Sequence, residues 1–138
     1  MNQMVGRGQR FRKNYLFVLL TIKILLMTIA TSEHLKDAVI KSIKDIASTT
    51  MPAGTRVILF GSRARHDARI DSDWDVLVLL DKDKISEQDH DNYTYPLWEL
   101  GWKTNQMIHL ILYTLSEWNR RKGSPFYENV EAEGVELC

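Results

Sequence analysis

The chain has 138 residues, of which 18 are Lys or Arg and 18 are Asp or Glu, so its formal net charge at pH 7 is zero. A chain of this length forms one domain with a modest core, which excludes a separate domain for a large substrate. The balanced charge gives no support for broad electrostatic binding to nucleic acids, and we expect no DNA binding.

The first 31 residues differ from the rest of the chain in charge and hydropathy. They contain five basic residues and no acidic residue, whereas residues 32–138 contain 13 basic and 18 acidic residues, a balance of −5. An apolar run over residues 15–30 follows the first basic residues, which is the order found in a signal peptide or a short anchor. We therefore expect a basic and apolar leader or extension over residues 1–31 and one domain over residues 32–138.

The sequence favours a cytoplasmic location over a membrane-bound or exported form. The apolar run is about 16 residues long and Lys23 interrupts it, whereas a spanning helix needs roughly 20 apolar residues. Three interpretations are open: Met27 is the true start and the preceding residues are misassigned, the protein is membrane-associated or exported, or an added helix packs on the domain or on a partner. We favour the start at Met27 and expect no stable membrane span. The only cysteine, Cys138, is terminal, which fits a reducing compartment.

A helix is predicted from Glu33 to about Ser48, with Ser32 as its N-cap. Its apolar residues recur at helical spacing and are Leu35, Val39, Ile43 and Ile46. A loop then leads to a β-branched and aromatic run over residues 56–60, which predicts a buried strand.

Gly61 ends that strand in a tight turn and allows a ligand to approach the backbone closely. Ser62 and the residues after it can open a helix, whose first N–H groups are unpaired and attract phosphate. Because Gly-Ser is also among the commonest loop dipeptides, an ordinary turn is the alternative interpretation.

Two carboxylates follow at Asp73 and Asp75, at the start of the apolar run 76–80. Side chains alternate along a strand, so both carboxylates point to the same face. Such a pair repels itself unless a cation lies between them, and Mg²⁺ is the cation that shares carboxylate ligands with substrate phosphates. The plain alternative is an acidic turn before a strand, but the turn and the pair together favour a site for a metal-bound nucleoside triphosphate.

The second half of the domain adds one long helix, one strand and a short last helix. A capping box at Ser86 opens a helix that runs to about Leu100, with Pro96 as a kink and Gly101 as its end. A third strand is predicted over residues 107–113. A last helix begins at residue 125, a proline, and is stopped by the glycine at residue 134.

The pattern of Gly61 and Ser62, ten further residues, and then Asp73 and Asp75 resembles the minimal nucleotidyltransferases of the DNA polymerase β-like superfamily. The surrounding segments, LFGSRAR and DSDWDVLVLL, are similar to the family's usual setting, and the resemblance covers about residues 32–137. It implies an α/β (α+β) fold with a small mixed β-sheet flanked by helices.

The resemblance also implies an enzyme, a nucleotidyltransferase, with ATP or another nucleoside triphosphate as co-substrate and Mg²⁺ as cofactor. Gly61 and Ser62 would bind the β- and γ-phosphates, and Asp73 and Asp75 would hold the metal while an acceptor hydroxyl attacks the α-phosphate. Arg63 and Arg65 are candidate phosphate contacts. Their alternative role is to cover the surface or to pair with neighbouring aspartates.

The chain departs from the family at a third carboxylate that active members carry on a later strand. The matching strand, 107–113, contains no Asp or Glu, and His109 is its titratable side chain besides Tyr113. A histidine in an apolar strand is commonly a structural residue. If its ring faces Asp73 and Asp75, it can take the acceptor proton, because its pKa is ordinarily near neutrality.

The acceptor cannot be identified from the sequence, and a helical partner protein or a homo-oligomer is expected to complete its pocket. An RNA acceptor is one open alternative, because basic residues cluster at 120–122. The alternative function is that of a catalytically weak, antitoxin-like partner of a small helical (HEPN-type) toxin protein, since the resemblance extends to proteins encoded beside such a partner.

Overall fold

A computed structural model describes the backbone of residues 5–138 and the side chains of residues 12–138. The chain forms two compact units, one up to Asp37 and one from Ala38 to Cys138. The first helix, α1 (Val5–Thr50), contributes to both units. Every residue that the sequence assigns to the site belongs to the second unit.

The prediction that a helix begins after Ser32 is wrong, because Ser32 lies inside α1. No proline interrupts the chain there, and the polar residues are accommodated by the helix itself. The hydroxyl groups of Thr28 and Thr31 donate to the carbonyl groups of Ile24 and Met27, four residues earlier, each at 2.9 Å. These hydroxyl groups are thereby satisfied without a break in the helix.

Residues 12–50 of α1 form a helix long and apolar enough to cross a membrane by length and composition, with a mean hydropathy of 2.0 in the most apolar stretch. None of that stretch is buried. A signal sequence near an N-terminus meets the same criterion of length and composition. The three interpretations of the N-terminal residues therefore stay open, and the absence of a stable membrane span stays a prediction.

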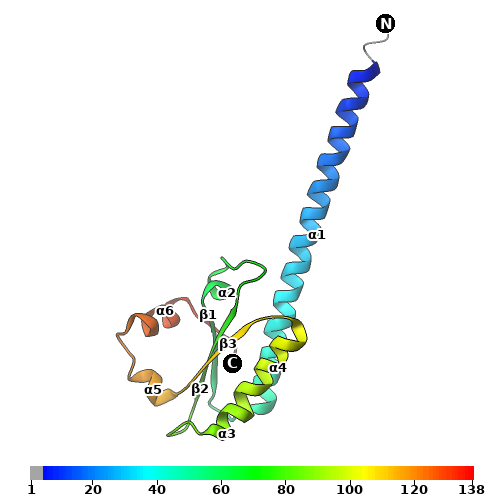
Figure 1. The fold of residues 1–138 in the computed structure, drawn as a ribbon. Coiled ribbons are helices and arrows are strands. Elements are labelled where there is room, and N and C mark those ends of the chain that lie inside the picture. Colours follow the sequence, from blue (N-terminus) through cyan, green and yellow to red (C-terminus); the bar gives the residue numbers. More distant parts are fainter. Residues whose placement is uncertain (1–4) are drawn as a thin grey trace. The chain divides into compact units, whose positions relative to one another are not determined.

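The second unit is built on a four-stranded sheet in the order β3-β2-β1-β4 (Figure 1). Its strands are β1 (Arg56–Phe60), β2 (Trp74–Leu80), β3 (Ile108–Thr114) and β4 (Val135–Glu136). β1 pairs antiparallel with β2 and β4, whereas β2 and β3 are parallel. The small mixed sheet flanked by helices is confirmed.

Helices cover both faces of this sheet (Figure 1). The larger core lies on one face, where Val39 and Ile43 of α1 and Leu97 of α4 pack against buried strand residues. The smaller core lies on the other face around Trp118, which is fully buried. The helices after α1 are α2 (Ser62–Arg65), α3 (Glu87–Asp89), the π-helical turn η1 (His90–Thr94), α4 (Tyr95–Thr104), α5 (Leu115–Asn119) and α6 (Pro125–Glu133).

The helix predicted from residue 86 to about 100 is interrupted and ends later than expected. Pro96 stands in the first turn of α4, where no N–H donor is needed, and the irregularity falls before it in η1. Gly101 does not end α4, which continues to Thr104. A Cβ atom at Gly101 would lie 2.7 Å from the carbonyl oxygen of Gln106, so this glycine allows the chain to return closely toward β3.

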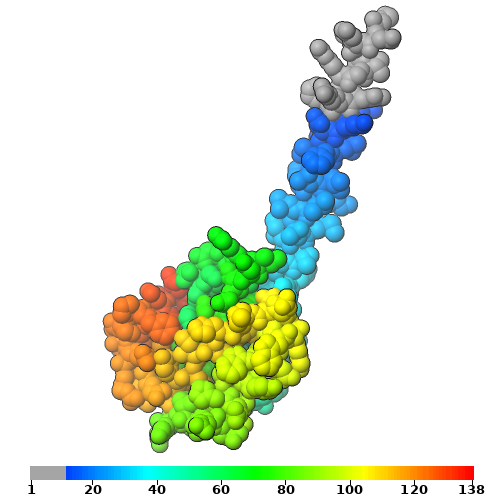
Figure 2. Space-filling view, in the orientation of Figure 1, coloured from blue at the N-terminus to red at the C-terminus, as the bar shows by residue number. Residues whose placement is uncertain are grey.

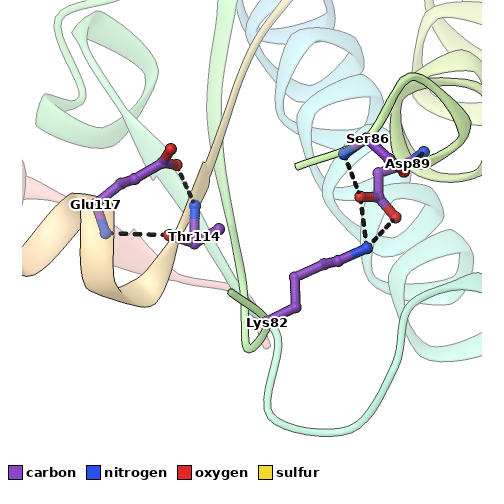
Figure 3. A network of polar contacts seen from close by, with 5 residues as sticks. All are labelled: Lys82, Ser86, Asp89, Thr114 and Glu117. Carbon is purple, nitrogen blue, oxygen red and sulfur yellow. Dashed lines mark hydrogen bonds and ion pairs between the residues drawn. The ribbon is translucent and has the colours of Figure 1, made fainter. Parts of the chain in front are cut away.

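Two capping boxes fix the ends of β2 and β3 (Figure 3). Asp89 is 5% exposed, accepts from the backbone N–H of Ser86 at 2.7 Å and pairs with Nζ of Lys82 at 2.7 Å. The Lys82 ammonium is the main cause that lowers the pKa of Asp89. At the end of β3, Glu117 accepts from the N–H of Thr114 at 2.8 Å. The contacts of Asp89 thus hold the start of the crossover that connects β2 to β3. The contact between Glu117 and Thr114 holds the chain where β3 ends and α5 begins.

Candidate active site

Gly61 joins β1 to α2 in a backbone conformation that glycine favours. Its φ is 71°, and a Cβ atom at this position would collide with Oδ2 of Asp75. Its carbonyl oxygen accepts from the N–H groups of Ala64 and Arg65, both at 3.1 Å. The Asp75 carboxylate therefore lies directly against the turn, and only a residue without a side chain allows this approach.

The turn after Gly61 presents backbone donors. Because Ala64 and Arg65 donate to Gly61, the N–H groups of Ser62 and Arg63 are the two at the start of α2 without an acceptor in the helix. The helix has four residues, so its dipole is small and these donors are what the turn offers to an anion. This is the turn to which the sequence assigns phosphate binding.

The acidic pair lies at the start of β2. Asp75 belongs to the strand and its side chain is 25% exposed, whereas Asp73 is exposed and precedes the strand. Asp75 points away from the core that contains Trp74 and Val76, because side chains alternate along a strand. In the described part of the chain the Asp73 carboxylate has no hydrogen bond or ion pair, so its oxygens are available to a ligand.

His109 lies beside this pair because β2 and β3 are parallel and place Asp75 opposite His109. Nδ1 of His109 is 3.2 Å from Oδ1 of Asp75, and the His109 side chain is 63% exposed. The sequence left open whether this ring faces the acidic pair, and the structure shows that it faces Asp75. Gly61, Asp75 and His109 thus come from three separate segments and lie together at the same end of β1, β2 and β3.

The described residues contain no group of three or more His, Cys, Asp or Glu side chains that is arranged to hold a metal ion. The available donors are the carboxylates of Asp73 and Asp75, which are hard oxygen ligands. Mg²⁺ is commonly bound by one or two carboxylates, with water and substrate phosphates in the other positions. The donor set therefore fits a cation that keeps several waters and shares its other positions with substrate phosphates.

Arg63 is directed into the protein. It is 8% exposed, and its Nη2 donates to the carbonyl oxygens of Ser72 at 2.9 Å and Ile70 at 3.3 Å. Its Cζ lies 4.5 Å from the centre of the Trp74 ring. Burial lowers the pKa of Arg63, although the Asp71 carboxylate acts in the opposite direction.

Arg65 is on the surface and forms ion pairs with Asp67 at 3.4 Å and with Glu133 at 3.5 Å. The hydrogen bond to Asp67 is the main cause that raises the pKa of Arg65. These contacts correspond to the alternative that the sequence left open for the two arginines. The role of Arg65 as a phosphate contact stays a prediction.

Sequence reasoning assigned no role to Gln106, which ties the site strands together. Its Oε1 accepts from Nε1 of Trp74 at 3.0 Å, and the carbonyl of Met107 accepts from the N–H of Trp74 at 2.8 Å. The two partners are 32 residues apart, and no local pattern signals such a contact. These bonds fix the start of β3 against the start of β2, one residue before Asp75 and His109.

A groove of about 720 Å³ lies beside this junction. Its lining includes Asp71, Trp98, Trp102 and Met107, so an acidic side chain stands at the edge of an aromatic and apolar surface. Figure 2 shows the corresponding green and yellow segments next to each other on the visible face of the second unit. Its lining residue Asp71 belongs to the same loop as Asp73.

Residues 36–130, more than half of the chain, match the family described as nucleotidyltransferase domain. A search of curated proteins finds no match.

Solved structures with a similar fold include one described as a toxin-antitoxin with AMP-PNP. It has 19% sequence identity and a TM-score of 0.52, over 72% of each chain. Another is a Sulfolobus solfataricus protein provisionally described as a nucleotidyltransferase, with 22% identity and a TM-score of 0.47, over 76% of this chain and 84% of that one. The first of these likenesses supports the fold described above.

Proposed function

Because the chain belongs to the nucleotidyltransferase domain family, we propose that it transfers a nucleoside monophosphate from ATP or another nucleoside triphosphate to a hydroxyl acceptor. The enzyme class follows from the family. The donor, the metal and the roles of the individual residues are the proposal, as is a cytoplasmic location, which is where nucleoside triphosphates are supplied.

The observation that carries this proposal is the contact between the Asp75 carboxylate and the turn at Gly61. Backbone N–H groups that can bind phosphate and a carboxylate that can bind a cation lie close together, as binding of a metal-bound triphosphate requires. A carboxylate against backbone donors alone would repel a phosphate, so a cation is needed to join the two. Asp73 and Asp75 are the residues that would hold it, and Mg²⁺ would neutralise charge on the phosphates when bound.

We assign to His109 the role of the general base, which takes the proton of the acceptor hydroxyl. Its Nδ1 faces Asp75, which orients the ring and leaves Nε2 for the acceptor hydroxyl. In the reaction the acceptor oxygen forms a bond to the α-phosphorus, the bond to the bridging oxygen breaks, and pyrophosphate leaves. The proton of the hydroxyl passes to Nε2 of His109. A histidine at this position would take over proton transfer from the absent third carboxylate but would not add a hard metal ligand.

The test is incubation of the full chain with labelled ATP, Mg²⁺ and candidate acceptors, with release of pyrophosphate as the readout. Asp73→Ala and Asp75→Ala are expected to reduce the rate at least about 100-fold, because each removes a charge that holds the cation at the phosphates. Asp83→Asn, in the exposed turn after β2, is the matched control and should retain the rate. Equal rates in all four proteins would contradict the proposal.

A second candidate is an antitoxin-like role toward a small helical partner protein. Four large side chains on α4 and just before β3 are exposed, namely Tyr95 at 50%, Trp98 at 44%, Trp102 at 70% and Met107 at 67%. An aromatic and apolar surface of this kind favours a protein partner. The fold likeness to a toxin-antitoxin protein supports the same interpretation.

The two candidates are distinguished by co-purification with a helical protein encoded beside this chain. An antitoxin that acts by binding retains its partner in Asp73→Asn/Asp75→Asn and loses it in Trp102→Asp. An enzyme that needs no partner transfers nucleotide when purified alone, and its rate in Trp102→Asp tests whether the groove lined by Trp98 and Trp102 binds the acceptor.

A further inference from the structure

Arg63 lies between the two halves of the proposed site without reaching into it. Its own backbone N–H belongs to the turn that follows Gly61, and its guanidinium bonds the carbonyl oxygens of Ile70 and Ser72. The carbonyl of Ser72 belongs to the same peptide group as the N–H of Asp73. One side chain therefore connects the phosphate-binding turn to the peptide that carries the first metal ligand.

The geometry of this contact restricts the loop more than packing alone would. The guanidinium lies 4.5 Å from the centre of the Trp74 ring while Nη2 donates to both loop carbonyls. Trp74 is itself fully buried and is bonded to Gln106 and to the backbone of Met107. The end of the loop is therefore held between a fixed aromatic ring and a planar group with directed donors.

Burial of the Arg63 guanidinium carries a free-energy cost, and the need to fill this space does not account for a buried arginine here. Its Nε is the one buried side-chain nitrogen or oxygen in the described part of the chain without a hydrogen-bond partner. A buried donor without a partner is unfavourable, and an apolar side chain would fill the same space without that penalty. The contribution of the guanidinium therefore lies in the two bonds that it makes to the loop.

We propose that Arg63 is a positioning residue that sets the location of Asp73 for cation binding, and that it does not contact phosphate. The inference rests on the proposed function, because Asp73 is a metal ligand in that proposal. Partners that orient metal ligands typically change metal affinity about 10- to 100-fold when they are removed. The Asp75 side of the site is held independently by strand pairing with β1 and β3.

The test uses the full chain and two variants, Arg63→Gln and Arg63→Lys. The first removes the charge, and the second keeps the charge but lacks a planar fork that bonds two carbonyls while lying on an indole ring. Arg69→Gln, an exposed arginine of the same loop, is the matched control. Two quantities are measured: Mn²⁺ binding without nucleotide by electron paramagnetic resonance, and the Mg²⁺ concentration that gives half-maximal transfer.

Both Arg63 variants should weaken Mn²⁺ binding and raise the half-maximal Mg²⁺ concentration about 10-fold. At saturating Mg²⁺, their KM for the triphosphate should stay within about twofold of the wild type, because no phosphate contact is lost. Arg69→Gln should match the wild type in all three quantities. If Arg63→Gln does not fold, Arg63→Lys carries the same test, since it keeps the aliphatic stem and the charge.

Each contrary result has a separate meaning. Variants that are less heat-stable but have wild-type Mn²⁺ and Mg²⁺ dependence would overturn the inference and leave Arg63 a role in stability alone. A raised KM for the triphosphate with unchanged metal dependence would make it a phosphate contact and overturn the inference as well. A wild-type protein that binds no Mn²⁺ and transfers no nucleotide would refute the proposed function itself.

Discussion

The edge of the sheet at Gly61, Asp75 and His109 and the apolar stretch of α1 over residues 15–30 satisfy their polar groups in different ways. In the first region, residues from three segments contact one another across strand pairs. In the second, Thr21 donates to the carbonyl of Phe17 four residues earlier, and the large apolar side chains are exposed. The difference indicates that the proposed chemistry depends on tertiary placement in residues 38–138, whereas the Thr21 hydroxyl of the N-terminal stretch is satisfied within its own helix.

The strongest test of this comparison is Gly61→Ala. Gly61 has a positive φ, which a residue with a side chain rarely adopts, and a Cβ atom there would displace the Asp75 carboxylate. We therefore expect the transfer rate to fall on the order of 1,000-fold. Gly123→Ala is the control, because Gly123 also has a positive φ of 89° but a Cβ atom there meets nothing within 4 Å. Similar losses in the two variants would show that backbone strain, and not the contact with Asp75, is responsible.

His109→Ala should reduce the transfer rate by about 100-fold or more, since it removes the group assigned to the acceptor proton. Binding of the triphosphate with Mg²⁺, measured by calorimetry, should be retained. His90→Ala, an exposed histidine outside the site, serves as the control. A His109→Ala protein with the wild-type rate would show that solvent or a group of the acceptor, and not His109, takes the proton of the hydroxyl.

Asp89→Asn should lower the free energy of unfolding by about 2 kcal/mol, because it removes the charge that pairs with Lys82 in a largely buried capping box. Urea unfolding followed by tryptophan fluorescence measures this change. Asp83→Asn, in an exposed turn, should change it by less than about 0.5 kcal/mol. An Asp89→Asn protein with the wild-type free energy of unfolding would show that packing alone holds the crossover in place.

The same carboxylate makes stability dependent on pH. The pKa of Asp89 is lowered in the folded protein, so its contribution is present above the pKa of an unfolded aspartate, about 3.9, and is lost as the pH falls through the folded value. The pKa of Glu136 is lowered by Arg56 and acts in the same direction, although its side chain is half exposed. Urea unfolding between pH 5 and 3 should show a smaller loss of stability in Asp89→Asn than in the wild type.

Deletion of residues 1–26 should have the smallest effect on chemistry, with transfer rates within about twofold of the full chain, because all proposed site residues lie between 61 and 109. Solubility and partition into lipid vesicles are expected to change, since the deleted part includes exposed apolar side chains. A large loss of transfer in the shortened protein would show that the N-terminal helix takes part in the active unit.

Much of the fold was predictable because its signals are local. β1 lies at the predicted residues 56–60, and α6 begins at Pro125 and ends at Glu133 as expected. A strand bounded by glycine and a helix opened by proline each depend on a few adjacent residues. The start of α1 was not predictable from Ser32, because a cap residue begins a helix only where the residues before it do not continue the helix themselves. The extension of α4 past Gly101 was not predictable either, because the close return of the chain at Gln106 is a contact made outside the helix.

The sequence by itself determined the candidate site groups of this protein, since the glycine turn ends one predicted strand and the two aspartates, after ten further residues, stand at the start of the next. Only the tertiary structure decided what faces them. The parallel register of β2 and β3 brings His109 to Asp75, and the burial of Arg63 directs its guanidinium to the loop carbonyls. Register and burial arise from contacts between residues far apart in the chain, and for that reason no local pattern specifies them.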